Sequence, residues 1–330
     1  MYDWIEIDVE TGHDDTTKKQ KEITDNIKIM TFIKSYFNRV SWLNGLLINP
    51  DNDRTLDISI TSEGKVKIRV CPNKFIIGNN VQEASLRQVY ELFESLSALV
   101  GINLFDNAMV RKLDVTHTAI TDYPPEAYFP HLCEQKGFDR WQKRGTLYFE
   151  KRRGSKHNTK KFYDKVAEVN DRKKSRGGQV MPEEFEGKNL TRFEVCYTTN
   201  KKIAKAMGVT DEAVKLYHLF NKECVANLHA NWIHAYTSIP KQTESEMTFR
   251  KDMGGRAFTD EVFRQMCEDY GRQRIVEHIQ RADAMGVFQN RESNSNAKQK
   301  LLKAFKIDKP TSNLIQELDD KMLTFEPKWD

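Results

Sequence analysis

The alternation of apolar and polar positions predicts strands and helices that follow one another closely in the first third of the chain. Residues 56–60 and 65–70 alternate in this way, and the polar turn Ser62-Glu63-Gly64 between them predicts a β-hairpin. From 81 to 100 the apolar residues recur instead at three- and four-residue intervals, which predicts an amphipathic helix. This part of the chain therefore combines sheet and helix.

Three more strands are predicted in the middle of the chain, at residues 109–120, 146–150 and 190–197. The dipeptide Pro124-Pro125 predicts the start of a helix that extends to about residue 136. Beyond residue 200 helical patterns dominate, over residues 201–207, 211–236, 260–284 and 297–305. We therefore expect an α+β protein, with a catalytic domain over residues 1–200 and a mainly helical C-terminal region over residues 201–330.

The composition is that of a globular protein with a large charged surface, since 38% of its 330 residues are hydrophobic and 30% are charged. The net charge of +4 is small, so the placement of charge matters more than its sum. Five cysteines without a C-x-x-C pair argue against a disulfide framework or a zinc finger and favour the cytoplasm. The most apolar stretch, 92–105, is interrupted by polar residues, so we expect no membrane segment.

Two carboxylates stand on predicted strands whose other face is apolar. Asp114 lies in residues 111–116 and Glu194 in residues 190–196, each at a polar position of the alternation. If the strands are neighbours, the two carboxylates meet, and such a pair repels unless a cation lies between them. Oxygen ligands of this kind suit Mg²⁺ or Mn²⁺. The alternatives are a solvent-facing aspartate and a surface ion pair between Arg192 and Glu194.

A tyrosine among basic residues is the candidate nucleophile. Tyr163 lies in a stretch rich in lysine and arginine, and a phenol becomes a useful nucleophile where a metal or cations stabilise its phenolate. Lys165, two residues on, is placed to hold a scissile phosphate. A surface aromatic is the ordinary alternative. Tyr148 is a second candidate nucleophile that lacks such a lysine, and His117 has the wrong strand parity to join Asp114.

The same basic stretch suits a nucleic-acid backbone. Tyr148 or Phe149 could offer a stacking face for a base. Core packing is the alternative for both rings and is favoured for Phe149. Residues 201–219 have a helix–glycine–helix outline, centred on Gly208, that is suggestive of a DNA-reading helix-turn-helix. The helical region 201–330 as a whole is expected to bind DNA or a partner. The side chains expected to bind DNA are Lys151, Arg152, Arg153, Lys156, Lys160 and Lys161.

These segments resemble those of rolling-circle replication initiators. Residues 111–116 are similar to their R-x-D-x-T/A strand, 146–168 to their T-L-x-x-Y…Y-x-K-x-x-E segment and 192–194 to their R-F/V-E strand. Residues 71–80 resemble the S-P-x-K-x-x-x-G-x-N segment of the gene II/X replication proteins of filamentous phages. The Rep_trans initiators of small plasmids share the Asp, Tyr-x-Lys and Glu elements. The resemblance covers residues 54–210.

The resemblance implies a fold of the HUH-like nuclease kind, in which an antiparallel sheet bears a metal site with a tyrosine beside it. It implies Tyr163 as nucleophile, Lys165 beside the phosphate, and Mg²⁺ or Mn²⁺ held by Asp114 and Glu194. Glu168 is then a third ligand or a general base, or else a glutamate on a helix surface. The chain departs from the HUH pattern because its sequence carries no His-x-His pair on a predicted strand.

The function that the resemblance implies is rolling-circle initiation in the cytoplasm of a bacterial host. The protein nicks one strand at a single-stranded or melted replication origin, keeps a 5′-phosphotyrosyl link and frees a 3′-hydroxyl primer, then rejoins the strand. Host helicase, polymerase and single-strand binding protein are the expected partners. The alternatives are a non-catalytic origin-binding regulator, a relaxase for plasmid mobilisation, and a structural protein without metal dependence.

Overall fold

The computed structural model describes residues 1–10, 33–37, 40–49, 51–61, 64–151, 158–173, 181–210, 213–241, 272–287, 295–296 and 313–330. The chain groups into two compact units. One comprises Met1–Lys241 together with Glu317–Asp330, and the other comprises Gln242–Gln316. Within the second unit the structure describes helix α10 (Arg272–Ala284). All elements that position the candidate site belong to the first unit.

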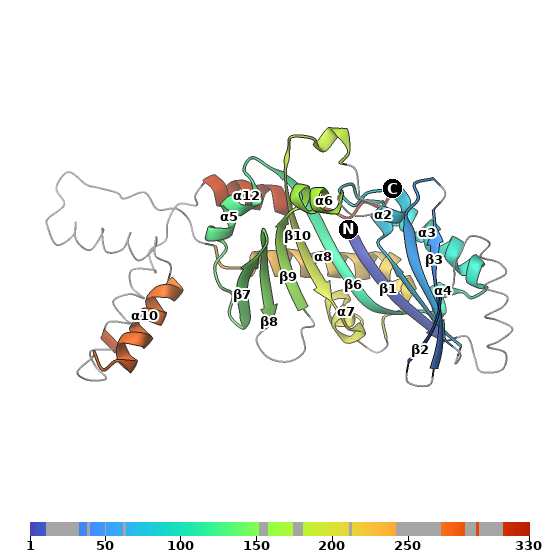
Figure 1. Cartoon of the computed structure of the whole chain (residues 1–330), viewed down its shortest axis with the longest axis horizontal. Coiled ribbons are helices and arrows are strands. Elements are labelled where there is room, and N and C mark those ends of the chain that lie inside the picture. The colour runs from blue at the N-terminus through green and yellow to red at the C-terminus, as the bar shows by residue number, and fades with distance from the viewer. Residues whose placement is uncertain are drawn as a thin grey trace. The chain divides into compact units, whose positions relative to one another are not determined.

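Ten strands of the described residues form one sheet in the order β2-β3-β4-β5-β1-β6-β10-β9-β8-β7, as Figure 1 shows. Every neighbouring pair is antiparallel. The α+β class and the antiparallel sheet expected from the sequence are confirmed. The strands are β1 (Tyr2–Glu10), β2 (Ile33–Phe37), β3 (Val40–Ile48), β4 (Thr55–Thr61), β5 (Lys65–Val70), β6 (Met109–Thr121), β7 (Phe138–Lys143), β8 (Thr146–Lys151), β9 (Asn158–Asp164) and β10 (Asn189–Tyr197).

The helices of the first unit are short or cover the sheet. The predicted hairpin is confirmed as β4 and β5, with Ile58 opposite Ile68. The predicted helix 81–100 begins only at residue 86, because the Ser85 hydroxyl and the Gln88 side chain form a capping box there. The helices are α2 (Pro72–Ile77), α3 (Leu86–Val100), α4 (Leu104–Asn107), α5 (Pro125–Tyr128), α6 (Lys165–Lys173), α7 (Asn200–Met207), α8 (Lys222–Thr237) and α12 (Asn313–Leu323), with 3-10 turns at η1 (Phe129–His131), η2 (Glu183–Phe185) and η3 (Leu216–Phe220).

Strand β1 is central to the sheet, although its acidic sequence gave no strand prediction. It pairs with β5 on one side and with β6 on the other. Its isoleucines at positions 5 and 7 are buried on one face. On the other face Glu6 forms an ion pair with Lys67, and Asp8 accepts from Arg111 at 2.6 Å. The acidic side chains of β1 are therefore neutralised by cations on the neighbouring strands.

The apolar face of the sheet is covered by α8 and by the C-terminal residues of the chain (Figure 1). Phe162 of β9 and Phe193 of β10 lie 4.5 Å apart, centroid to centroid. Trp232 and Tyr236 of α8 pack against Phe193 at 5.1 and 5.5 Å. All four side chains are buried, so an aromatic core fixes this face and leaves the opposite face for polar residues.

The helix predicted at 201–207 is confirmed as α7, and the helices predicted at 211–236 and 260–284 are confirmed in part, as α8 and α10. Helix α7 ends at Gly208, whose φ of 73° is left-handed, and the described residues that follow form no α-helix before Lys222. The chain there crosses back to the sheet, where Lys215 bridges Met109, so the described residues do not form the helix-turn-helix outline. Helices α7 and α8 pack on β6 and β10, which is why the compact unit continues past the boundary expected at residue 200.

The remaining helix predictions fare differently. The helix expected from Pro124-Pro125 to about residue 136 ends at Tyr128, and a 3-10 turn follows it. The prediction at 297–305 lies outside the described residues. Among the helices that the structure describes, none has the length and apolar character needed to cross a bilayer.

Candidate active site

Strands β6, β10 and β9 lie side by side and bring the predicted polar side chains to one face of the sheet. Cys196 of β10 is opposite Asp114 of β6, and Glu194 is opposite both Thr116 of β6 and Lys161 of β9. Because side chains alternate between faces, all these residues share the face opposite the aromatic core. The sequence predicted that the carboxylates of Asp114 and Glu194 meet if their strands are neighbours. The two strands are neighbours in the structure, so the carboxylates lie close together.

Two carboxylates and a thiol form a buried cluster on this face. One ligand atom each of Asp114, Glu194 and Cys196 lies within 4.8 Å of the others. The Cys196 thiol donates to Glu194 Oε1 at 2.9 Å, while Asp114 Oδ1 is buried without a hydrogen-bond partner. An unpartnered buried carboxylate oxygen is costly unless a cation or water satisfies it, so the donor set fits a metal ion. Cys196 was missed, although it shares the strand parity of Glu194.

Lysines on the neighbouring strands balance part of this negative charge. Lys112 Nζ lies 3.2 Å from Asp114 Oδ2, and Lys161 Nζ lies 2.7 Å from Glu194 Oε1. Burial and the Glu194 carboxylate nevertheless raise the pKa of Asp114 to about 6. The two lysines therefore do not fully compensate the negative charge of the cluster.

Tyr163 lies beside the cluster at the end of β9. Its hydroxyl donates to Glu194 Oε2 at 3.2 Å. Burial raises the pKa of Tyr163 well above 10, and the positive charge of Arg192 acts in the opposite direction. The next residue, Asp164, accepts from the amides of Val166 and Ala167, so it caps α6 and ends the strand directly after the tyrosine.

Arg192 is a buried cation that the sequence pattern allowed to be a surface residue. Its Nη1 lies 3.2 Å from Asp3 Oδ1 and its Nε donates to Thr118 Oγ1 at 2.8 Å. Its Nη2 donates to the carbonyl of Asn80. The guanidinium is thus fixed opposite Tyr163 in the register, and the proposed surface pair with Glu194 is replaced by a pair with Asp3.

Lys165 and Glu168 bond to each other at the start of α6. The Lys165 side chain is fully buried, and its ammonium forms an ion pair with Glu168. Burial and the nearby Arg192 lower the pKa of Lys165 to about 7. Glu168 lines the same cavity as Tyr163 but does not belong to the three-ligand cluster, because the change from strand to helix at Asp164 turns it toward Lys165.

The residues expected to bind DNA divide between the two faces. Lys161 lies on the face of the cluster, and Lys151 is exposed at the end of β8. Lys160 alternates to the other face, where its buried ammonium donates to the Ala235 carbonyl at 2.7 Å, so it cannot track a backbone beside Tyr163. Arg152, Arg153 and Lys156 lie outside the described residues. His117 also faces away from the cluster, as its strand parity predicted, and stacks on a phenylalanine.

A cavity of about 670 Å³ opens over the cluster. Its volume lies within the range of roughly 300–1,000 Å³ that ligand sites occupy. Its lining combines the candidate nucleophile, carboxylates, cations and aromatic rings. Among the lining residues are Asp3, Trp4, Arg69, Lys112, Asp114, Arg144, Tyr148, Lys161, Tyr163, Glu168 and Glu194.

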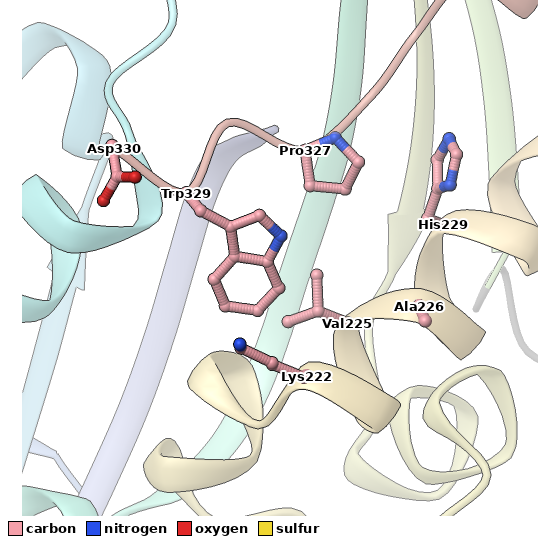
Figure 2. Close-up of a pocket in the computed structure, with 7 residues that line it drawn as sticks. All are labelled: Lys222, Val225, Ala226, His229, Pro327, Trp329 and Asp330. Atoms are coloured by element: carbon pink, nitrogen blue, oxygen red, sulfur yellow. The ribbon is translucent and has the colours of Figure 1, made fainter.

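A second cavity of about 650 Å³ lies between α8 and the C-terminal residues and differs in chemistry (Figure 2). It is lined mainly by apolar groups of Val225, Pro327 and Trp329. The His229 ring in its wall is 2.8 Å from the carbonyl of Phe325, so it serves the packing of the tail. This lining has no pair of carboxylates beside a tyrosine, and the chemistry therefore points to the first cavity.

The comparison with protein families shows which family this chain belongs to. The family model for the N-terminal part of the phage gene II replication-associated protein matches residues 1–213. The chain belongs to this family of filamentous-phage replication proteins. The family match includes β1 and the rest of the sheet, so it reaches beyond the residues 54–210 that carried the resemblance. A role in phage DNA replication by the rolling-circle route follows from membership, and with it an interaction with DNA.

Other comparisons add little to the family. No curated protein matches the chain. Among solved structures, the di-domain ARO/CYC BexL from the BE-7585A biosynthetic pathway matches with 13% identity over 73% of this chain and 99% of that chain. The TM-score of 0.19 shows that the two backbones do not superpose, so this likeness carries no argument.

Proposed function

We propose that this replication protein nicks one strand of DNA at the origin by attack of Tyr163 on a phosphodiester. The observation that carries the proposal is the hydrogen bond from the Tyr163 hydroxyl to Glu194, because Glu194 also belongs to the buried cluster with Asp114. A candidate nucleophile and a candidate metal site therefore share one side chain. Such coupling suits phosphoryl transfer, in which a nucleophile and charge stabilisation must act on one phosphate.

Asp114 and Glu194 are the residues that would hold the metal, with Cys196 beside them. Two carboxylates favour Mg²⁺ or Mn²⁺, while the thiol adds a softer donor. When bound, the ion would neutralise charge that develops on the scissile phosphate. Lys112 and Lys161 line the same cavity and add positive charge for the phosphate oxygens.

The chemistry of the step balances within these residues. The Tyr163 oxygen forms a bond to phosphorus as the bond from phosphorus to the 3′ oxygen breaks. Glu194 Oε2 accepts the phenolic proton, which finally resides on the departing 3′-hydroxyl. Arg192 stabilises the phenolate as it forms, since its positive charge favours the ionised tyrosine.

The phosphotyrosyl bond keeps the 5′ end on the protein. A later 3′-hydroxyl can therefore reverse the step and close a circle, which hydrolysis by water would prevent. The free 3′-hydroxyl is the primer for a host polymerase, and helicase and single-strand binding protein are the partners that unwinding requires. Lys165 acts in this scheme as a positioning residue, because its buried ion pair with Glu168 fixes the turn that follows Tyr163.

The test is a nicking assay on supercoiled DNA that carries the sequence flanking the gene. Wild type and Tyr163→Phe are compared with Mg²⁺ or Mn²⁺ and with chelator, and covalent adducts are resolved on denaturing gels. We expect an adduct that requires metal and is absent from Tyr163→Phe, while the control Tyr148→Phe retains it. An adduct in Tyr163→Phe would assign the nucleophile to another residue. Intact binding without a nick in wild type would favour a regulator that does not cut.

A further inference from the structure

Two aromatic rings stack on the face of the candidate active site, at one edge of the sheet. Trp141 of β7 lies opposite Tyr148 of β8, and their ring centroids are 4.0 Å apart with an interplanar angle of 7°. Tyr148 lies in turn opposite Lys161, which lies opposite Glu194. The register thus places the stacked pair in one cross-strand row with the carboxylate that binds the Tyr163 hydroxyl.

The stacked pair is not part of the core. Trp141 is 36% exposed and lies on β7, the last strand of the sheet, so one side of its ring faces Tyr148 and the other faces the open edge. The aromatic residues that fill the core, Phe149 of β8 and Phe162 of β9, lie on the opposite face of the sheet. A large aromatic side chain at an exposed sheet edge has a surface available for a planar ligand.

The distance from the pair to the candidate nucleophile is that of a nucleotide or two. Tyr148 lies opposite Lys161, two residues along β9 from Tyr163. With strands about 4.8 Å apart and a rise of about 3.4 Å per residue, the backbones of Tyr148 and Trp141 lie roughly 8 and 12 Å from that of Tyr163. Tyr148 lines the same cavity as Tyr163, together with Arg144 at the β7–β8 turn. Lys143, at the end of β7, is exposed on the same face. The hairpin therefore presents a flat aromatic surface flanked by cations.

We propose that Trp141 and Tyr148 form a stacking platform for a nucleobase of the DNA strand that is cut, one or two nucleotides from the scissile phosphate. The identity of that strand rests on the proposed function. Base-on-aromatic stacking with cations along the backbone is the mode in which proteins bind single strands without reading their sequence. In a duplex both faces of each base are covered by its neighbours, so the platform selects a melted or single-stranded segment.

The proposal is tested by binding, in the Tyr163→Phe background, so that the result does not depend on cutting. The probes are a short fluorescent oligothymidylate and a strand of the same length whose sugars carry no bases. Fluorescence anisotropy gives the dissociation constants for Tyr163→Phe alone and with Trp141→Ala, Trp141→Phe or Trp329→Ala. Trp329 is a matched control, since it is 37% exposed but lies beside α8, away from the sheet's polar face (Figure 2).

We expect Trp141→Ala to weaken binding of the oligothymidylate roughly 5- to 150-fold and to leave binding of the abasic strand unchanged. Trp141→Phe should retain most of the affinity, and Trp329→Ala should retain all of it. The platform is ruled out if Trp141→Ala weakens both probes equally, if it weakens neither, or if the parent protein binds the two probes alike. A failure of nicking in the wild type with a normal base preference would instead overturn the proposed function and leave the platform in place.

Discussion

Asp114 is a candidate metal ligand whose buried carboxylate lowers the stability of the folded protein. Its carboxyl lies 6% exposed beside Glu194, and its pKa rises to about 6 as a result. A carboxyl whose pKa is raised by folding binds its proton more tightly in the folded state. The ionised form therefore costs stability, and this cost grows as the pH rises from about 4 to about 6 and then stays constant.

Replacement of Asp114 by Asn should stabilise the metal-free protein at neutral pH. The gain should be roughly 3 kcal/mol, since the shift is about two pKa units and one unit corresponds to about 1.4 kcal/mol, and it should disappear below about pH 4, where the wild-type carboxyl is protonated as well. Urea unfolding in chelator across this pH range measures the effect. Equal or lower stability of Asp114→Asn at neutral pH would show that Lys112 already compensates the charge.

The same carboxyl sets the pH dependence of metal binding. Protonation removes a ligand, so we expect the affinity for Mn²⁺ to fall as the pH decreases through about 6. Asp114→Asn should lose most of this affinity at all pH values. Titration of free Mn²⁺ by electron paramagnetic resonance measures both, with Lys151→Ala as a control outside the cluster. A flat pH profile in the wild type would place the ion elsewhere.

Arg192 stabilises the fold through the geometry of its guanidinium group as well as through its charge. Its three donors serve Asp3, Thr118 and the Asn80 carbonyl, and its side chain has no exposed surface. Arg192→Lys keeps the charge but cannot satisfy all three partners from one ammonium. We expect it to lower the free energy of unfolding by roughly 3 kcal/mol, as for other disrupted buried ion pairs. A loss below about 1 kcal/mol in chemical denaturation would contradict this role.

At the scale of elements, strand parity correctly predicted which side chains share a face of the sheet. Most differences between prediction and structure lie at the ends of strands and helices. The faces of Asp114 and Glu194 follow from alternation, which depends only on backbone geometry. The ion pair of Lys165 with Glu168 could not be predicted, because it depends on the exact residue at which strand β9 ends and helix α6 begins. Strand β1 was missed although its sequence carries the signal, because Ile5, Ile7 and Val9 alternate with acidic residues. The cations that neutralise those acidic residues lie on other strands.

The start of helix α3 can be tested directly, because it is fixed by a capping box. The Ser85 hydroxyl accepts from the Gln88 amide at 3.1 Å, and the Gln88 side chain accepts from the Ser85 amide at 2.9 Å. Ser85→Ala should lower the free energy of unfolding by about 1 kcal/mol. Ser95→Ala is the matched control on the same helix, because that exposed hydroxyl only bonds a carbonyl one turn earlier. Equal effects of the two substitutions would remove the capping box as the cause.

At the scale of the whole molecule, the first compact unit is completed by residues from the far end of the described chain. Phe325 stacks on His117 and packs on Trp232, and Asp319 accepts from the Tyr236 hydroxyl at 2.6 Å. Leu318 and Met322 are also buried. A boundary drawn from helix content could not anticipate this return, since the packing of α12 depends on an apolar surface built by other elements.

A chain truncated after Lys241 should therefore be much less stable than the full chain. Removal of α12 and the tail uncovers the aromatic core, at a cost on the order of 5 kcal/mol or more for several large apolar side chains. Thermal unfolding and dye binding to exposed apolar surface measure the loss. A truncated chain with an unchanged melting temperature would show that the sheet and α8 suffice.

The central place of β1 has a consequence for how the protein is made on the ribosome. This strand is synthesised before the other strands of the sheet, and its two partners, β5 and β6, end at residues 70 and 121. At about 5–20 residues per second, β1 waits roughly 5–20 s before the second partner is complete. Both of its edges are open until β5 is complete, and the edge that pairs with β6 stays open for the rest of that time. Glu6 and Asp8, unpaired at that stage, then act as charges that keep nascent chains from joining strand to strand.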